Sequence, residues 1–169
     1  IYAVGGLSYS EGGGGGRIAV TGYTTDTHTG SLDAKGGGYT YHSSPVAGLS
    51  GSIFMKSTTQ IYGTLYTSNG AAVPVQTRET VLSNDTYDQR IYEGNARVKN
   101  AENFTLPSGS TMRINGGASL NLFSGQTLNL SNGSTTNLNS AGILNIGSGA
   151  STVLAPGATF NSNAGSFIN

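Results

Sequence analysis

The second half of this chain repeats every eight residues, and this period constrains the fold more than any other feature of the sequence. One column of the repeat is aliphatic in seven successive octads: Leu106, Ile114, Leu122, Leu130, Leu138, Ile146 and Leu154. A second apolar column lies two positions earlier and is interrupted twice by threonine: Phe104, Met112, Leu120, Leu128, Thr136, Leu144, Thr152, Phe160 and Ile168. Most octads carry glycine three positions after the first column. A fixed short period with turn residues in phase is typical of a solenoid.

Each octad has the pattern of one short strand followed by one turn. Its consensus is Thr-Leu-Asn-Leu-x-Ser-Gly-x, in which apolar and polar residues alternate before the turn. Alternation with a period of two puts both apolar side chains on one face and the intervening asparagine on the other. Frequent glycine and β-branched threonine oppose a helix. The sequence therefore predicts an all-β fold, a parallel β-helix or β-solenoid with its apolar columns inside.

The number of octads in one turn is not given by the period itself. One octad is too short to close a coil, whereas three octads, about 24 residues, form a three-faced turn and two, about 16, form a flatter coil. We favour three. An intertwined trimer, in which each of three chains supplies one octad per layer, is compatible with the same spacing.

Three octads per turn would also stack polar side chains on the outside. In that register Asn145 lies above Asn121, and Asn161 lies above Asn137, along the direction in which the strands pair. Stacked asparagines form hydrogen-bonded amide ladders. We therefore expect aliphatic ladders inside the coil and amide ladders outside it.

The chain divides into three zones by composition. Residues 1–70 are rich in glycine and tyrosine, residues 71–103 carry nine of the sixteen charged residues, and residues 104–169 hold the octads. The first zone contains a degenerate duplication: Gly16-Arg17-Ile18 with Gly30-Ser31-Leu32, and Gly51-Ser52-Ile53 with Gly63-Thr64-Leu65. Five glycines in succession, 12–16, lack the Lys-Ser/Thr of a phosphate-binding loop and indicate a place where backbones approach closely. We interpret 71–103 as a charged junction with exposed loops.

The balance of charge excludes several classes of partner. Lysine plus arginine and aspartate plus glutamate are eight each, so no net field attracts nucleic acid or an anionic membrane. The chain has no cysteine, and no apolar run approaches the ~18 residues of a membrane span. We expect no cofactor.

The last octad carries no charge that would block strand pairing. No charged residue occurs between Ile114 and Asn169, and the sequence finishes with Phe167 and Ile168 in a strand-like stretch. Exposed strand edges pair with other chains unless charge, proline or a cap prevents it. We therefore expect Phe167 and Ile168 to form an assembly edge, and the aliphatic column from Leu106 to Leu154 to form the core ladder behind it.

Candidate catalytic groups occur in the charged zone. Parallel β-helices include polysaccharide lyases and hydrolases, and Glu79 and Glu102 are separated by nearly one turn, with Asp85, Asp88 and Arg90 nearby. Two carboxylates at a set separation are what glycosidases need. We nevertheless favour a solvated surface for these residues, because this zone holds most of the charge. Calcium binding by Asp85 and Asp88 lacks the dense oxygen spacing of known loops, so we predict neither an enzyme nor a metal site.

Histidines and tyrosines complete the candidate list. His28 and His42 lie in polar loops with no carboxylate or second histidine at ligand spacing. Seven of the nine tyrosines fall in the first 66 residues. A tyrosine ring offers a flat amphipathic face to a sugar or a protein, although it can equally cover glycine-rich strands. The tyrosines that we select as a binding surface are these: Tyr39, Tyr41, Tyr62 and Tyr66.

Three glycine-led stretches resemble glycine-rich β-helical segments of large bacterial surface and adhesin-like proteins, and the octads resemble the solenoid stalks of such proteins. The stretches are Gly12–Val20, Gly30–Gly37 and Gly51–Lys56. The resemblance implies an extracellular, rod-like and non-catalytic protein, and the shortness of the chain favours a fragment or a polymerising subunit. We therefore expect a structural β-solenoid at the cell surface that self-associates into an oligomer or filament. A glycan- or receptor-binding module of an adhesin or phage tail fibre is the alternative.

Overall fold

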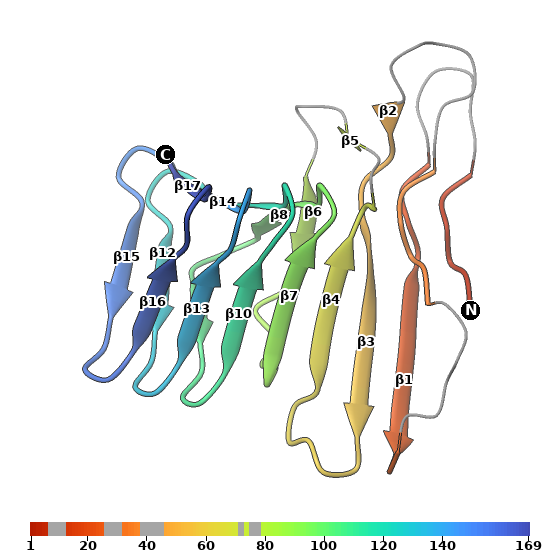
Figure 1. The fold of residues 1–169 in the computed structure, drawn as a ribbon, viewed down its shortest axis with the longest axis horizontal. Helices are drawn as coiled ribbons and strands as arrows, with labels where there is room; N and C mark the ends of the chain where they lie inside the picture. Colours follow the sequence, from red (N-terminus) through yellow and green to blue (C-terminus); the bar gives the residue numbers. More distant parts are fainter. Residues whose placement is uncertain (7–12, 26–31, 38–45, 71–72, 75–78) are drawn as a thin grey trace.

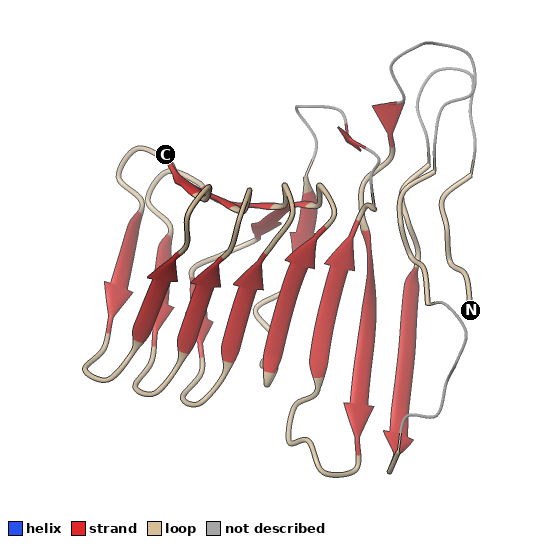
Figure 2. Ribbon diagram, viewed as in Figure 1, coloured by secondary structure: helices blue, strands red, loops and turns tan. Residues whose placement is uncertain are grey.

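A computed structural model describes residues 1–6, 13–25, 32–37, 46–70, 73–74 and 79–169. Within these ranges the chain forms strands, turns and loops and no helix (Figure 2), so the described part contains no helical segment that could cross a bilayer. The strands follow one another around a coil whose turns are stacked side by side along the long axis of the molecule (Figure 1). The chain is a β-solenoid, as the octads predict.

Three sheets form the faces of the coil, and a small fourth sheet lies beside them. Sheet I contains β1 (Arg17–Tyr23), β3 (Gly51–Ser57), β4 (Thr64–Ser68), β7 (Gln89–Glu93), β10 (Thr111–Ile114), β13 (Thr135–Leu138) and β16 (Thr159–Ser162). Sheet II contains β6 (Thr80–Leu82), β8 (Arg97–Asn100), β11 (Ser119–Leu122), β14 (Ile143–Ile146) and β17 (Phe167–Ile168). Sheet III contains β9 (Phe104–Leu106), β12 (Thr127–Leu130) and β15 (Ser151–Leu154). The fourth sheet pairs β2 (Val46–Ala47) with β5 (Val73–Pro74).

Strand pairing in the octad region fixes the length of a turn. Thr111 pairs with Thr135, Ser119 with Ile143, and Thr127 with Ser151, all parallel. Each residue thus lies beside the residue three octads later, and one chain completes every turn by itself. The three-octad coil is confirmed, and neither the two-octad coil nor the intertwined trimer is formed.

Each corner between octads is a tight turn closed by one backbone hydrogen bond. The N–H of Ser134 donates to the carbonyl of Ser131 at 3.0 Å, and the same bond recurs eight residues later from Gly142 to Asn139 at 2.8 Å. The third residue of such a turn has positive φ, as a type II turn requires. Glycine supplies it in all corners of the octad region except one, where Ala141 adopts φ 58°. The glycine column is therefore a column of turns.

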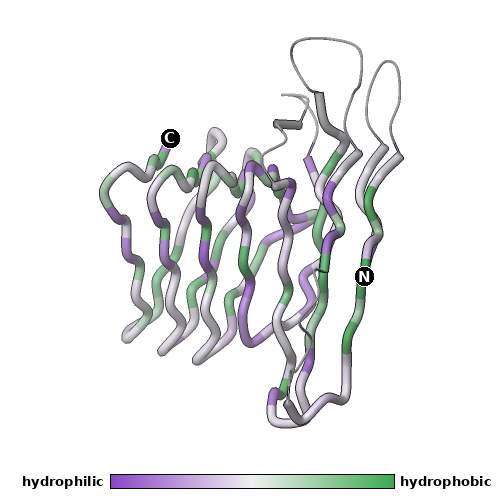
Figure 3. The backbone as a smooth tube through the Cα atoms, turned by 45° about the vertical axis from the view of Figure 1, so that its right-hand side comes forward, coloured by the Kyte–Doolittle hydropathy of each residue, from purple (hydrophilic) through white to green (hydrophobic). Residues whose placement is uncertain are grey.

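The two apolar columns line the inside of the coil. Figure 3 shows hydrophobic and hydrophilic segments alternating along the stacked turns. The column residues of the inner turns are almost fully buried: Phe104, Leu106, Met112, Ile114, Leu120, Leu122, Leu128, Leu130, Leu138 and Leu144. Ile146 is half-buried, and Leu154 is 50% exposed because it belongs to the last turn, which no further turn covers. Thr136, one of the two interruptions, is buried, and its hydroxyl has no hydrogen-bond partner within the described chain.

The turns that lead into the octad region are two residues shorter than the octad turns. Gln89 pairs with Thr111 and Arg97 with Ser119, so these turns have 22 residues. In this register Arg90 lies in the inward column beside Met112, where it is 1% exposed. The expectation that Arg90 belongs to a solvated charged surface is therefore wrong.

Buried Arg90 is held by aromatic rings and carbonyl oxygens. Its guanidinium carbon lies 4.2 Å from the ring centre of Phe104 and 4.8 Å from that of Tyr87. One guanidinium nitrogen donates to the carbonyl oxygens of Asp85 at 2.5 Å and Ser83 at 3.4 Å. Cation–π contact and hydrogen bonding are the two ways in which a guanidinium can be buried without a carboxylate. Arg90 thereby fastens the loop 83–88 onto the first octad turn.

The N-terminal zone departs from the regular coil. Strands β3 and β4 pair antiparallel, with Ile53 opposite Tyr66. The related stretches Gly51-Ser52-Ile53 and Gly63-Thr64-Leu65 are therefore two arms of a hairpin, and not successive turns of a solenoid. Residues 32–34, which alternate as a strand does, form only an isolated bridge between Asp33 and Tyr2.

Four glycine-rich segments pack together at this end and are named here the glycine bundle: 1–6, 13–16, 33–37 and 48–51. Gly16 and Gly13 of the second segment donate to the first, Gly37 of the third donates to the second, and Gly51 of the fourth donates to the third, over 2.6–2.9 Å. The second segment also donates to the fourth, and the first to the third. A strand in a sheet bonds to two neighbours, but the second and third segments each bond to three. The backbones therefore form a bundle and not a sheet.

Candidate functional sites

The last turn presents an even layer of strand edges. Sheets I, II and III end on β16, β17 and β15, and these three strands are consecutive octads of one turn. At the other end the same sheets finish on β1, β6 and β9, which belong to different turns. Among the residues that the structure describes, only those of the C-terminal end thus offer the flat, three-sided layer on which another turn of the same coil could pair.

Apolar side chains are exposed at this layer. Phe167 is 56% exposed, Ile168 51%, and Val153 and Leu154 50% each. Leu154 and Ile168 continue the inner columns, since they pair with Leu130 and Leu144 of the previous turn. The predicted edge residues Phe167 and Ile168 therefore lie in the terminal layer, and the aliphatic ladder ends on an uncovered rung.

Amide ladders end at the same layer. Asn169 donates through Nδ2 to Oδ1 of Asn145 at 2.9 Å, and Asn145 donates in turn to Asn121. A second ladder joins Asn163, Asn139 and Asn115, with bonds of 2.6 Å. A third joins Asn161 to Asn137 at 2.9 Å. In each ladder the amide group donates to the asparagine of the preceding turn. The carboxamide oxygens of Asn161, Asn163 and Asn169, in the last turn, therefore accept no hydrogen bond from a further asparagine of these ladders.

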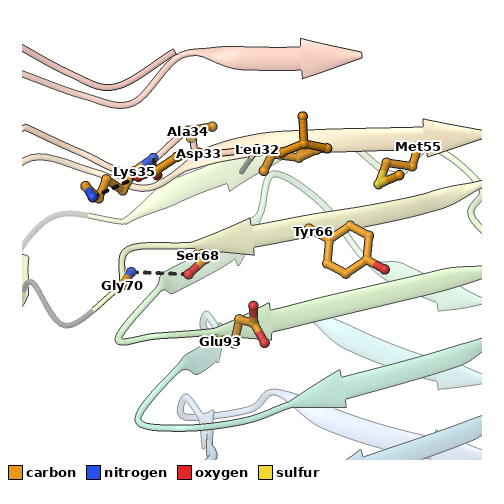
Figure 4. Close-up of a pocket in the computed structure, with 11 residues that line it drawn as sticks. Leu32, Asp33, Ala34, Lys35, Met55, Tyr66, Ser68, Gly70 and Glu93 are labelled. Carbon is orange, nitrogen blue, oxygen red and sulfur yellow. Dashed lines mark hydrogen bonds and ion pairs between the residues drawn. The ribbon is translucent and has the colours of Figure 1, made fainter. Parts of the chain in front are cut away.

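A second candidate site is a groove on the outer face of sheet I. It has a volume of about 430 Å³ and lies over β3, β4 and β7, with the segment 32–35 as one wall (Figure 4). Ile53, Met55 and Tyr66 form its apolar floor, and Ser68 and Glu93 line its polar end. The side chains of Tyr66 and Glu93 come from neighbouring strands, because Ser68 of β4 pairs with Glu93 of β7.

Charged groups stand on both sides of the groove. Lys35 Nζ lies 2.8 Å from Asp33 Oδ2, and the Lys35 backbone N–H donates to Asp33 Oδ1 at 3.0 Å. Partial burial tends to raise the pKa of Asp33, but the hydrogen bonds and charge of Lys35 together lower it below 3.8. The hydrogen bond and charge of Asp33 raise the pKa of Lys35 in turn. Both groups are ionised near neutral pH, and with exposed Glu93 the groove has a formal charge of −1.

The structure describes two of the four predicted tyrosines, Tyr62 and Tyr66. Tyr66 lines the groove. Tyr62 is 47% exposed in the loop between β3 and β4 and does not line the groove, and its backbone N–H donates to Asp88. Tyr39 and Tyr41 lie outside the described residues. Of the two described tyrosines, therefore, Tyr66 alone lines the groove.

The carboxylates considered for catalysis are not brought together in one cavity. Glu79 precedes β6, where its carboxylate lies 3.8 Å from Lys99 Nζ, in a shallow hollow that Glu102 does not line. Glu102 is exposed at the corner after β8. Asp88 Oδ2 accepts the N–H groups of Tyr62 and Gly63, and Asp85 accepts the hydroxyl of Ser83. These aspartates cap loops.

No group of three or more potential metal-ligating residues occurs in the described ranges. His28 and His42 lie outside those ranges. The residues of the groove that sequence patterns missed are Glu93 and the Asp33–Lys35 pair. Glu93 is the last residue of β7, and only the pairing of β7 with β4, which the sequence does not indicate, places it next to Ser68. The i,i+2 spacing of Asp33 and Lys35 was a visible signal for a local ion pair.

No protein-family model matches this chain, and neither a curated protein nor a solved structure matches it.

Proposed function

We propose that this chain is a structural β-solenoid of an extracellular fibre, whose C-terminal layer pairs with a further octad layer. The observation that carries the proposal is that the inner columns and amide ladders continue into the turn of β15, β16 and β17, whose outer strand edges are exposed. Leu154, Phe167 and Ile168 are about half exposed there, and no charge from Ile114 onward opposes pairing.

The chemical groups of the terminal layer determine what kind of layer could pair with it. The outer edges of strands β15, β16 and β17 are free and need parallel or antiparallel backbone partners. The half-exposed residues of the inner columns need aliphatic side chains to cover them. The carboxamide oxygens of Asn161, Asn163 and Asn169 need amide donors. An octad layer meets all three needs, and it can come from a second copy of this chain or from a continuation of the same coil.

The scarcity of charge, 9% of residues, supports a structural role, and the resemblance to bacterial surface proteins supports a location outside the cell. A uniform, weakly charged coil offers strength along its axis by repeating backbone pairing. Antibody labelling of intact cells that make the protein tests the location, and labelling that requires permeabilised cells would contradict it.

Self-association is tested by light scattering coupled to size exclusion between about 1 and 500 µM. We expect oligomers that grow with concentration. Phe167→Lys places a charge in the terminal layer and should return the protein to a monomer. Asn129→Lys, which is outward on the fully paired strand β12, is the matched control and should associate like the wild type.

The continuation of the coil is tested by appending a copy of residues 146–169 to Asn169. We expect hydrogen exchange of β15, β16 and β17 to slow by at least about tenfold, because their edges become paired. A wild type that stays monomeric at all concentrations, together with an appended turn that protects none of these strands, would overturn the proposal.

A further inference from the structure

We propose that the groove on the outer face of sheet I is a carbohydrate site, which binds a neutral or amino sugar between the ring of Tyr66 and the carboxylate of Glu93. This site is separate from the terminal layer. It lies over β3, β4 and β7, whereas the terminal layer consists of β15, β16 and β17.

The groove combines the two kinds of surface that a sugar ring needs. A pyranose has an apolar C–H face and a rim of hydroxyl groups. Tyr66 offers a flat, half-buried ring beside Ile53 and Met55, and such an apolar floor with a few polar groups is typical of ligand sites. Figure 4 shows Tyr66, Ser68 and Glu93 projecting from adjacent strands on this one face.

The rim of the groove carries polar groups that could bind the hydroxyl groups of a sugar. The Asp33–Lys35 pair holds one donor and one acceptor in place at 2.8 Å on the wall. Glu93 is exposed on the opposite side, and its carboxylate has no ion-pair partner in the described part of the chain. An ionised carboxylate can accept hydrogen bonds from two adjacent hydroxyls or from an ammonium group.

Strand pairing disfavours a peptide in this groove. Extended peptides usually bind by adding a strand to a free sheet edge. Strand β3 pairs with β1 and β4, β4 pairs with β3 and β7, and β7 pairs with β4 and β10. The floor therefore offers side chains but no free backbone edge.

The charge of the groove selects among ligands. Asp33, Lys35 and Glu93 sum to −1, so phosphates and acidic sugars are repelled. Neutral sugars are accepted, and a sugar ammonium would gain an ion pair with Glu93. We therefore expect glucosamine to bind at least as well as glucose, and glucuronic acid to bind at least about fivefold more weakly.

Saturation-transfer NMR with methyl glycosides of glucose, galactose, N-acetylglucosamine, glucosamine and glucuronic acid tests the site. We expect a dissociation constant on the order of 1 mM for the best monosaccharide, as small ligands in open grooves show. Tyr66→Ala should weaken binding by at least about tenfold. Tyr62→Ala removes an exposed tyrosine outside the groove and should leave binding unchanged.

The preference for one sugar charge over another distinguishes loss of the site from loss of folding, because an unfolded variant would bind all sugars more weakly. Glu93→Gln should reduce the preference for glucosamine over glucuronic acid by about three- to tenfold, with the melting temperature unchanged. Phe167→Lys should not alter sugar binding, which separates this site from assembly. Absence of saturation transfer to any of the five sugars, or transfer that survives Tyr66→Ala, would overturn the assignment.

Discussion

In the octad coil, side chains set the distances inside each turn, whereas in the glycine bundle the backbones themselves touch. The coil buries aliphatic columns such as Leu106 and Leu130, and its backbone hydrogen bonds join stacked turns and close the corners within each turn. In the bundle, a Cβ atom built on Gly15 would lie 1.8 Å from the carbonyl oxygen of Ala34 and 2.6 Å from the N–H nitrogen of Gly51. The comparison shows that one chain can pack its segments either around buried side chains or directly backbone against backbone.

Glycine consequently has two different roles in the two regions. Gly125, in a corner of the coil, has φ 75° and no atom near its missing Cβ. Gly15 and Gly51 have no positive φ, but they lack the space for any side chain. Collagen uses glycine for the second reason, at a crowded axis that only glycine fits.

Substituting a glycine of each kind with alanine gives the largest expected effect. Gly15→Ala should destabilise the protein by about 3 kcal/mol or more, because the backbone of three segments must shift. Gly125→Ala should cost only about 1 kcal/mol, the penalty of a left-handed alanine. Urea unfolding measures both. Equal costs would show that the bundle is not packed backbone to backbone.

Core truncation sharpens the comparison within the coil. Leu130→Ala removes a side chain that is 1% exposed and should cost about 3 kcal/mol. Leu154→Ala, in the same column one turn later, removes a half-exposed side chain and should cost less than about 1 kcal/mol. A large cost for Leu154→Ala would mean that another layer covers it in solution, as the assembly proposal implies at high concentration. The measurement is therefore made at low and high protein concentration.

The amide ladders should contribute less to the free energy of unfolding than the buried leucines do. Asn139→Ala breaks the bonds to both Asn115 and Asn163 and should cost about 1–2 kcal/mol. Asn129 is also outward, but it pairs with Val153 and Thr105 and has no amide above or below it. Asn129→Ala is the matched control and should be nearly neutral. If the two variants unfold alike, the ladders contribute nothing measurable.

One corner offers a stabilising change. Ala141 holds φ 58° where the other octad corners carry glycine, so Ala141→Gly should stabilise the coil by about 1 kcal/mol. Ala150→Gly is the control, because Ala150 has no positive φ, and it should destabilise by about 0.5–1 kcal/mol. Thermal melting measures both, and a loss of stability in Ala141→Gly would contradict the turn assignment.

The smallest effect concerns pH and the groove wall. The pKa of Asp33 is lower in the folded state than in the unfolded chain. Its stabilising pair with Lys35 is therefore complete above the unfolded value of about 3.8 and is lost as the pH falls through the lower folded value. NMR titration of the Asp33 carboxyl should show no change between pH 5 and 8. A midpoint above 4 would contradict the ion pair.

The octads predicted the coil well because each level of the sequence agrees with the others. Period, strand alternation and turn glycine together predicted the octad coil, whereas three octads per turn was the favoured choice among the alternatives that the spacing allowed. The asparagine stacking followed from that choice. Arg90 lies two octads before Leu106, so the octad phase extended backward places it in an inward column, but its charge argued for a solvated surface. The pairing of β7 with β10 shows that it points inward.

The N-terminal zone was harder for a physical reason. Two of its related stretches, Gly51-Ser52-Ile53 and Gly63-Thr64-Leu65, are similar in sequence but run in opposite directions, since β3 and β4 pair antiparallel. Glycine carries no side-chain pattern, so hydrogen bonding to three neighbours leaves no periodic signal in the sequence. The groove shares this origin, because Asp33, Tyr66 and Glu93 meet only through the pairing of segments distant along the chain.

Disulfide trapping tests most directly the claim that one chain coils with three octads per turn. The chain has no cysteine of its own, so pairs can be introduced cleanly. Asn137 and Asn161 are direct neighbours on the outside of sheet I, within reach of the usual Cα separation of about 4.4–6.8 Å. Asn137→Cys with Asn161→Cys should form an intramolecular disulfide on mild oxidation, whereas Asn137→Cys with Val153→Cys should not. Cross-linking of the second pair, or disulfides that join separate chains in the first, would contradict the fold and with it the account built on it.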